Sequence, residues 1–65
     1  MRVRYFEDTD TLYIELRDAT VADMRDLDEN TLIEVDAEGR MVAITIEHAK
    51  ERAELGSFVY ERVEA

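Results

Sequence analysis

This chain has no cysteine, no proline and no tryptophan, and it has one histidine, His48. Because cysteine is absent, disulfides and thiolate zinc sites are excluded, and one histidine cannot build a His-rich metal site. A domain of 65 residues buries only about 60% of the surface that its unfolded chain exposes. Small domains usually compensate with disulfides, a structural metal or oligomerisation. Self-association or a partner chain is therefore the expected source of additional stability.

Positive charge is also scarce, since 17 acidic residues stand against 8 basic ones and the formal net charge is −9. Nucleic acids and anionic membranes both require a positive surface, so neither is expected as a direct partner. An acidic surface instead complements a basic protein and accelerates encounter with it. No stretch approaches the roughly 20 apolar residues of a membrane span, and the N-terminus starts with a strand pattern instead of a signal-peptide core. We expect a cytoplasmic protein.

Alternation of apolar and polar residues predicts two β-hairpins within one domain, residues 1–65. The first joins residues 2–7 to residues 11–17 through the polar turn Asp8-Thr9-Asp10. The second joins residues 31–36 to residues 40–47. The apolar positions that alternate in three of these strands are Val3, Tyr5, Leu12, Ile14, Leu16, Val42, Ile44 and Ile46.

The turn of the second hairpin has a recognisable chemistry. Asp36-Ala37-Glu38-Gly39 places Asp at the first position of a type I turn and Gly three residues later. At that last position a residue in the left-handed region forms the bulge of a three-residue hairpin loop. We therefore predict a positive φ at Gly39, because glycine adopts it without steric cost.

Three segments outside the hairpins are less regular. Residues 18–30 have apolar residues at helical spacing but four interrupting aspartates, so we predict an extended or irregular segment, with a helix or a short edge strand from Val21 as alternatives. Residues 48–55 favour a helix by propensity, and Gly56 fits the C′ position that ends one. The tail, residues 58–63, is apolar enough that it must pack within the chain or on a neighbour.

These elements predict an α+β fold, a small four-stranded antiparallel sheet of two β-hairpins with one C-terminal helix packed on it. Helix 48–55 and the apolar tail are expected to cover one face of the sheet. A single eight-residue helix covers one face at most, and soluble monomers rarely expose a large apolar patch. The surplus apolar surface therefore favours self-association.

Two segments carry a family resemblance. The first is Tyr5-Phe6-Glu7-Asp8-Thr9-Asp10-Thr11-Leu12-Tyr13-Ile14, and the second is Val35-Asp36-Ala37-Glu38-Gly39-Arg40-Met41-Val42-Ala43-Ile44-Thr45-Ile46. Together they resemble a family of small bacterial and archaeal proteins, the domain-of-unknown-function family numbered 2283, over roughly residues 3–49. Ala43 stands where the family usually has Gly, and Thr45 where it usually has Glu, so a function carried by that Glu would be missing.

The resemblance implies a compact α+β fold and no assigned enzymatic activity. Some proteins of this kind are thought to be encoded beside small toxin-like proteins. The resemblance therefore also implies that the chain binds another protein in the manner of an antitoxin.

Acidic residues in the turns are one group of candidate site residues. Asp8 with Asp10, and Asp36 with Glu38, could supply oxygen ligands to a hard cation such as Ca²⁺. Their spacing is not that of an EF-hand, however, and short acidic side chains are favoured in turns for backbone reasons. We therefore predict turn roles and no metal site. His48 has no nucleophile motif beside it, so no catalytic residue and no cofactor are predicted.

Aromatic residues are the other group, and they indicate a protein interface. Tyr13 points away from the face that Leu12 and Ile14 share, and tyrosine is enriched in interfaces. Phe58 and Tyr60 lie in the tail. We predict a non-enzymatic protein-binding module, a homodimer with these three aromatic residues at interfaces and with a basic protein as a second partner. The alternative is a metal-dependent binding module or a small enzyme that uses Asp8, Asp10 and Asp36.

Overall fold

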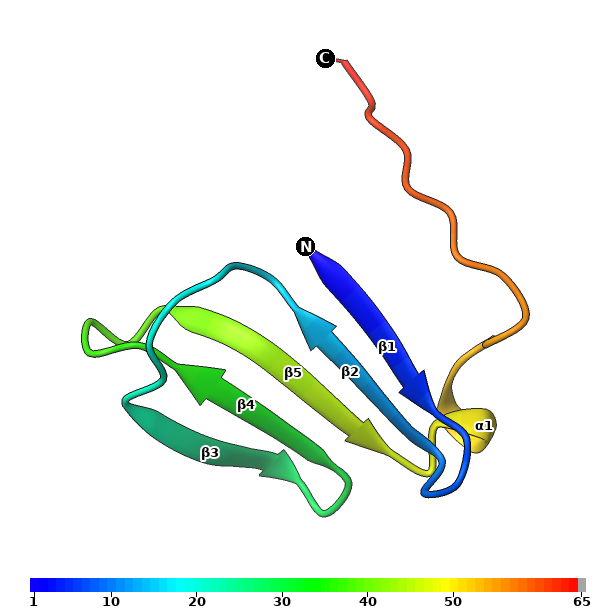
Figure 1. Ribbon diagram of the computed structural model, residues 1–65, viewed down its shortest axis with the longest axis horizontal. Helices are drawn as coiled ribbons and strands as arrows, with labels where there is room; N and C mark the ends of the chain where they lie inside the picture. The colour runs from blue at the N-terminus through cyan, green and yellow to red at the C-terminus, as the bar shows by residue number, and fades with distance from the viewer. Residues whose placement is uncertain (65) are drawn as a thin grey trace.

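Alternating apolar and polar residues build a single antiparallel sheet in the computed structural model, which describes residues 1–64 (Figure 1). Its strands are β1 (Arg2–Phe6), β2 (Thr11–Glu15), β3 (Asp23–Asp28), β4 (Thr31–Val35) and β5 (Met41–Glu47), followed by the short helix α1 (Ala49–Arg52). Their order in space is β1-β2-β5-β4-β3, so β5 is central and β1 and β3 are the edges.

The two predicted hairpins are confirmed, and they join along β2 and β5. The pairing of Ile14 with both Val3 and Ile44, and of Ile44 with Ile33, aligns apolar residues of four strands in one row. Since side chains alternate between the two sides of a strand, this register gathers apolar residues on one side of the sheet. We call this side the apolar face; it is formed by Val3, Tyr5, Leu12, Ile14, Ile33, Ile44 and Ile46.

The sheet has five strands and not the four predicted, because part of residues 18–30 forms β3. The alternative of a short edge strand was correct, although the strand begins at Asp23 and not at Val21. All six residues of β3 are exposed, and four of them are charged. An exposed edge strand has no buried side to impose alternation, so the sequence pattern was not informative, and its charges are typical of a protected sheet edge.

The turn between β4 and β5 has the predicted geometry. Gly39 has a φ of 81°, and its N–H donates a hydrogen bond of 3.0 Å to the carbonyl oxygen of Asp36. The N–H of Asp36 in turn donates to the carbonyl oxygen of Arg40 at 2.9 Å. Glycine is favoured here because a side chain at positive φ crowds its own backbone.

The C-terminal helix is shorter than the predicted 48–55 span. Before it, His48 is in the left-handed region with φ 54°, and after it, Ala53 is extended with φ −147° and ψ 157°. So short a helix has no stability of its own. It is attached to the end of the sheet instead, since Ala49 N–H donates to the carbonyl oxygen of Asp10 at 3.0 Å. Gly56 does not have a positive φ, so its assignment as the C′ residue was wrong.

Helix α1 does not cover the apolar face as predicted, and the tail reaches this face only at Phe58, which lines a groove with Val3, Leu12 and Ile14. Helix α1 lies beside the β1–β2 turn, and the tail leaves it and runs past β1 beyond the N-terminus (Figure 1). The side chains of Phe58, Tyr60 and Val63 are 67%, 72% and 86% exposed. These residues follow α1 in an extended conformation without entering the sheet.

The resulting core is small. Among residues 1–64, the buried apolar residues are Val35, Val42, Ala43 and Ala49, while Ile14, Ile33, Ile44 and Ile46 in the centre of the apolar face are only half-buried. The radius of gyration is 13.0 Å, compared with about 10.7 Å for a compact domain of this length. The protein is a single sheet followed by a short helix and an extended segment, and it is less compact than such a domain. Within the same residues, no helix is long and apolar enough to cross a membrane.

The Gly39 turn is open to a direct test. Replacing Gly39 with Val should lower the free energy of unfolding by about 1–2 kcal/mol, since the strain lies in the backbone and no atom lies within 4 Å of the added Cβ. At about 4–8 °C per kcal/mol, the melting temperature should fall measurably in a calorimetric scan. Gly56→Ala is the control, because Gly56 has equal space and no positive φ. Equal melting temperatures for the two variants would contradict the assignment.

Candidate functional site

The side of the sheet opposite the apolar face carries most of the charged residues of the strands, and we call it the polar face. Tyr13 pairs with Thr45 at its centre, and Glu15 and Glu34 both pair with Ala43. Two complete rows cross the sheet here: Arg4, Tyr13, Thr45, Leu32 and Asp26 form the first, and Arg2, Glu15, Ala43, Glu34 and Met24 form the second.

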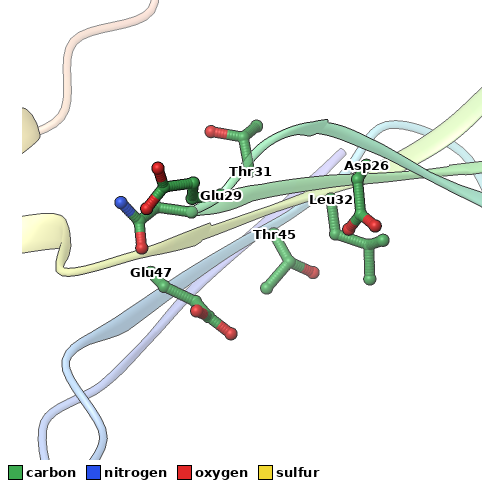
Figure 2. Close-up of a pocket in the computed structure, with 7 residues that line it drawn as sticks. Asp26, Glu29, Thr31, Leu32, Thr45 and Glu47 are labelled. Atoms are coloured by element: carbon green, nitrogen blue, oxygen red, sulfur yellow. The ribbon is translucent and has the colours of Figure 1, made fainter.

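A small pocket of about 110 Å³ opens on the polar face near the β3–β4 turn. Figure 2 shows the side chains of Asp26, Leu32, Thr45 and Glu47 pointing to the same side of the sheet, whereas Thr31 points to the other. Glu29 and Asn30 line the pocket from the turn. The pocket is therefore lined by the carboxylates of Asp26, Glu29 and Glu47 and by the apolar side chain of Leu32.

Four carboxylates of the polar face have no cationic partner within residues 1–64. The acidic residues that do form salt bridges in this part of the chain are Asp23, Asp28, Asp36 and Glu38. Those left unpaired on the polar face are Glu15, Asp26, Glu34 and Glu47. The arginines of this face, Arg2 and Arg4, both lie on the edge strand β1. The region over β2, β5, β4 and β3 is therefore negatively charged.

Tyr13 lies in the middle of this acidic region and is half-buried. Its position on the side opposite Leu12 and Ile14 confirms the orientation predicted from the alternation. Burial, and then the negative charges of Glu34 and Glu15, raise the pKa of Tyr13, while Arg4 acts in the opposite direction. The hydroxyl therefore stays protonated, as an uncharged donor among carboxylates. Its role at an interface remains a prediction.

The side chain of the turn residue Asp10 forms hydrogen bonds within its own chain. Its carboxylate accepts a hydrogen bond of 2.7 Å from the Tyr5 hydroxyl and one of 3.1 Å from the N–H of Lys50. The bond to Asp10 raises the pKa of Tyr5 to about 12, and the same bond lowers the pKa of Asp10. Asp8, nearby, accepts a 3.0 Å bond from the N–H of Thr9. These contacts match the predicted turn roles.

Asp36 is an anchor at the opposite end of the sheet. One carboxylate oxygen accepts hydrogen bonds from the N–H groups of Glu38 and Arg40 at 3.0 and 2.9 Å. The other accepts from the guanidinium groups of Arg17 and Arg40. The hydrogen bond from Arg17 is the main reason that the pKa of Asp36 falls to about 2. Since Arg17 follows β2, this carboxylate ties the β2–β3 connection to the β4–β5 turn.

The alternative site made of Asp8, Asp10 and Asp36 is not assembled. Asp10 lies near α1 at one end of β5, and Asp36 lies beyond the other end, in the β4–β5 turn. Within residues 1–64, no group of three or more His, Asp or Glu side chains is arranged to hold a metal ion. His48 is exposed at the start of α1. The turn carboxylates thus serve local structure.

The three predicted interface residues lie in two separate places. Tyr13 is on the polar face, whereas Phe58 and Tyr60 line a hollow of about 530 Å³ with Met1 and Val3 beside β1. The carboxylates of the polar face were missed by the sequence analysis. Glu15 and Glu34 become neighbours of one residue, Ala43, only because β2 and β4 flank β5. The signal available in the sequence was their position out of phase with the apolar residues.

The resemblance to a known family is confirmed. The family described as a protein of unknown function, DUF2283, matches residues 2–50. This span includes all five strands and the start of α1, and it ends before the tail. Neither a curated protein nor a solved structure matches the chain.

The anchor at Asp36 predicts a pH dependence of stability. Because its pKa is about 2 in the folded protein and near 3.9 when unfolded, the unfolded state binds more protons between these values. Stability from Asp36 is therefore complete above about pH 4 and is lost as the pH falls toward about 2. Urea unfolding across this range should give a steeper loss for the wild type than for Asp36→Asn. Parallel curves for the two proteins would contradict the anchor role.

The acidic surroundings of Tyr13 predict that its pKa depends on the charge of its neighbours. Neutralising Glu34 as Glu34→Gln should lower the pKa of Tyr13 toward the ordinary value, because one of the charges that oppose ionisation is removed. Ultraviolet absorbance of the phenolate measures this change, and Tyr13→Phe identifies which of the three tyrosines is responsible. If Glu34→Gln shifts the titration equally when Tyr13 is already Phe, the assignment is wrong.

Proposed function

Because the chain belongs to DUF2283, a family of unknown function, its role must be argued from its surfaces, and we propose that it is a non-enzymatic module that binds a basic protein. The observation that carries this proposal is the set of unpaired carboxylates on the polar face, Glu15, Asp26, Glu34 and Glu47. Like charges held on one rigid surface repel one another, and a cationic partner relieves that repulsion.

The chemistry of the face suits lysine and arginine side chains of a partner protein. The pocket beside Thr45 offers carboxylates from Asp26, Glu29 and Glu47, with Leu32 against which an aliphatic stem can pack. Tyr13 adds an aromatic surface and a hydroxyl in the adjacent position. Tyrosine residues near the centre of an interface are typical of the residues that contribute most to protein binding.

A stoichiometric complex with one small basic protein is the form of binding that the charge favours most. The net charge of −9 on 65 residues opposes compactness, and a partner of opposite charge removes that penalty. An acidic protein that neutralises a basic one in this way would act as an antitoxin acts on its toxin. A gene for a small basic protein beside the gene of this chain would support this version.

The test is capture of the partner from the source organism by three tagged forms of the full chain. These are the wild type, the face variant Glu15→Gln/Glu34→Gln/Glu47→Gln, and the control variant Glu7→Gln/Asp18→Asn/Glu51→Gln. Both variants lose three negative charges, but the control changes exposed residues outside the polar face. We expect a basic protein to co-elute with the wild type and the control, and binding to weaken by about tenfold or more in the face variant.

A further expectation concerns salt. Binding through exposed charges is screened, so the affinity for the captured protein should fall as ionic strength rises. Equal loss in both variants would mean that net charge, and not the polar face, governs binding. Equal binding by all three forms would exclude the polar face as the binding surface.

A further inference from the structure

The apolar face is open although its composition is that of a protein core. Ile14, Ile44 and Ile33 form a continuous row across β2, β5 and β4, and Leu12 pairs with Ile46 in the next row. All of these residues are only half-buried. Among the described strand residues of β1, β2, β4 and β5, none that is charged lies on this face. Soluble proteins rarely leave such a surface in water.

The surface area of the chain reflects both the open face and the extended residues after α1. The chain exposes 5380 Å², whereas a compact monomer of its mass exposes about 4,300 Å². The excess, about 1,100 Å² per chain, matches or exceeds the roughly 600–1,000 Å² that each partner buries in a standard protein interface. The excess is therefore large enough for a stable dimer.

The residues after α1 lie beside the β1–β2 part of this face. Leu55 and Phe58 form a groove of about 180 Å³ with Val3, Leu12 and Ile14. Farther along, Phe58 and Tyr60 border the hollow of about 530 Å³ beside Met1 and Val3. A hollow this large and lined by apolar residues has room for several side chains.

We propose that a second copy of this chain covers the apolar face, and that residues 57–63 of each copy lie against β1 of the other. The hollow between tail and β1 then receives the partner's tail, and the two sheets face each other as in a β-sandwich. A two-fold dimer of this kind is self-complementary, since each copy offers the same sheet face and the same tail.

Charge favours a second copy over a different kind of partner on this face. The carboxylates of each copy, such as Glu15 and Glu34, lie on the polar face and point away from the interface. The part of the face formed by β1, β2, β4 and β5 has no charged strand residue, so it has no electrostatic preference for a basic protein and matches the same surface of a second copy. Arg25 lies at its β3 edge. The dimer leaves both polar faces exposed, so it is compatible with the proposed binding of a basic protein without depending on it.

The first test is the molecular mass of the full-length protein in solution. Light scattering at micromolar concentration should give twice the mass of one chain. Phe58→Ser/Tyr60→Ser should weaken the dimer by at least about tenfold, because aromatic residues buried at interfaces carry most of the binding energy. The control Phe6→Ser/Met24→Ser removes exposed apolar residues from the polar face and should remain dimeric.

The tail variant keeps its own fold, since Phe58 and Tyr60 are exposed within one chain, and circular dichroism verifies this. Raising the salt concentration should strengthen the dimer, because two chains of charge −9 repel each other. Salt should have the opposite effect on binding of a basic protein, so the two proposals fail independently.

The second test uses the absence of cysteine from the native chain. A Val3→Cys protein is mixed with a Tyr60→Cys protein under mild oxidation, and a covalent heterodimer should form rapidly because the tail of one copy reaches β1 of the other. A mixture of Val3→Cys with Leu27→Cys is the control, since Leu27 is exposed on the far edge strand β3.

A wild-type monomer at micromolar concentration would overturn the proposal. Equal cross-linking in the two mixtures would overturn the exchange of tails, and so would a double variant Val3→Cys/Tyr60→Cys that closes a disulfide only within one chain. A dimer that is unaffected by Phe58→Ser/Tyr60→Ser would likewise exclude the tail from the interface.

Discussion

The register of β5 with its two neighbours is the constraint on which the other features of this protein depend. Ile44 is paired with Ile14 on one side and Ile33 on the other, while Ala43 is paired with Glu15 and Glu34. A shift by one residue would exchange the two faces of the strand. This single alignment therefore creates both an apolar face and an acidic face from strands that are far apart in sequence.

The ends of the sheet are held by side chains that bind backbone. At one end, the Asp36 carboxylate accepts hydrogen bonds from N–H groups of its own turn and from the guanidinium group of Arg17. Because Arg17 follows β2, this contact links the β2–β3 connection to the β4–β5 turn. At the other end, the Asp10 carboxylate accepts a hydrogen bond from the N–H of Lys50. The guanidinium group of Arg52 donates to the carbonyl oxygen of Asn30 at 3.0 Å. Acidic residues in the turns therefore stabilise a sheet whose apolar core is small.

The two faces suggest different roles for the two groups of aromatic residues. Tyr13 belongs to the polar face and is surrounded by carboxylates, so it is placed to contact a cationic partner. Phe58 and Tyr60 belong to the exposed tail and lie beside Met1 and Val3, so they are placed to extend a core across two chains. Self-association and recognition of another protein can then occur on opposite sides of one sheet.

The sequence alone determined the features that rest on local chemistry. Alternation in residues 2–7, 11–17 and 40–47 predicted three of the strands, and residues 31–36 were predicted to be extended. The residues Asp36 to Gly39 predicted the turn and its positive φ. The same alternation placed Tyr13 opposite Leu12. These features depend on residues within one or two strands, where period and turn type are sufficient.

The tertiary structure alone decided the features that depend on strand order and on coverage. Strand β3 carries no apolar alternation because it lies exposed at an edge, and the acidic face exists only because β2 and β4 flank β5. The helix predicted over residues 48–55 ends at Arg52, since Ala53 is extended and Phe58, Tyr60 and Val63 beyond it are exposed. Helix propensity depends on a residue and its neighbours in sequence. The length and burial of a helix depend instead on its packing against the rest of the fold.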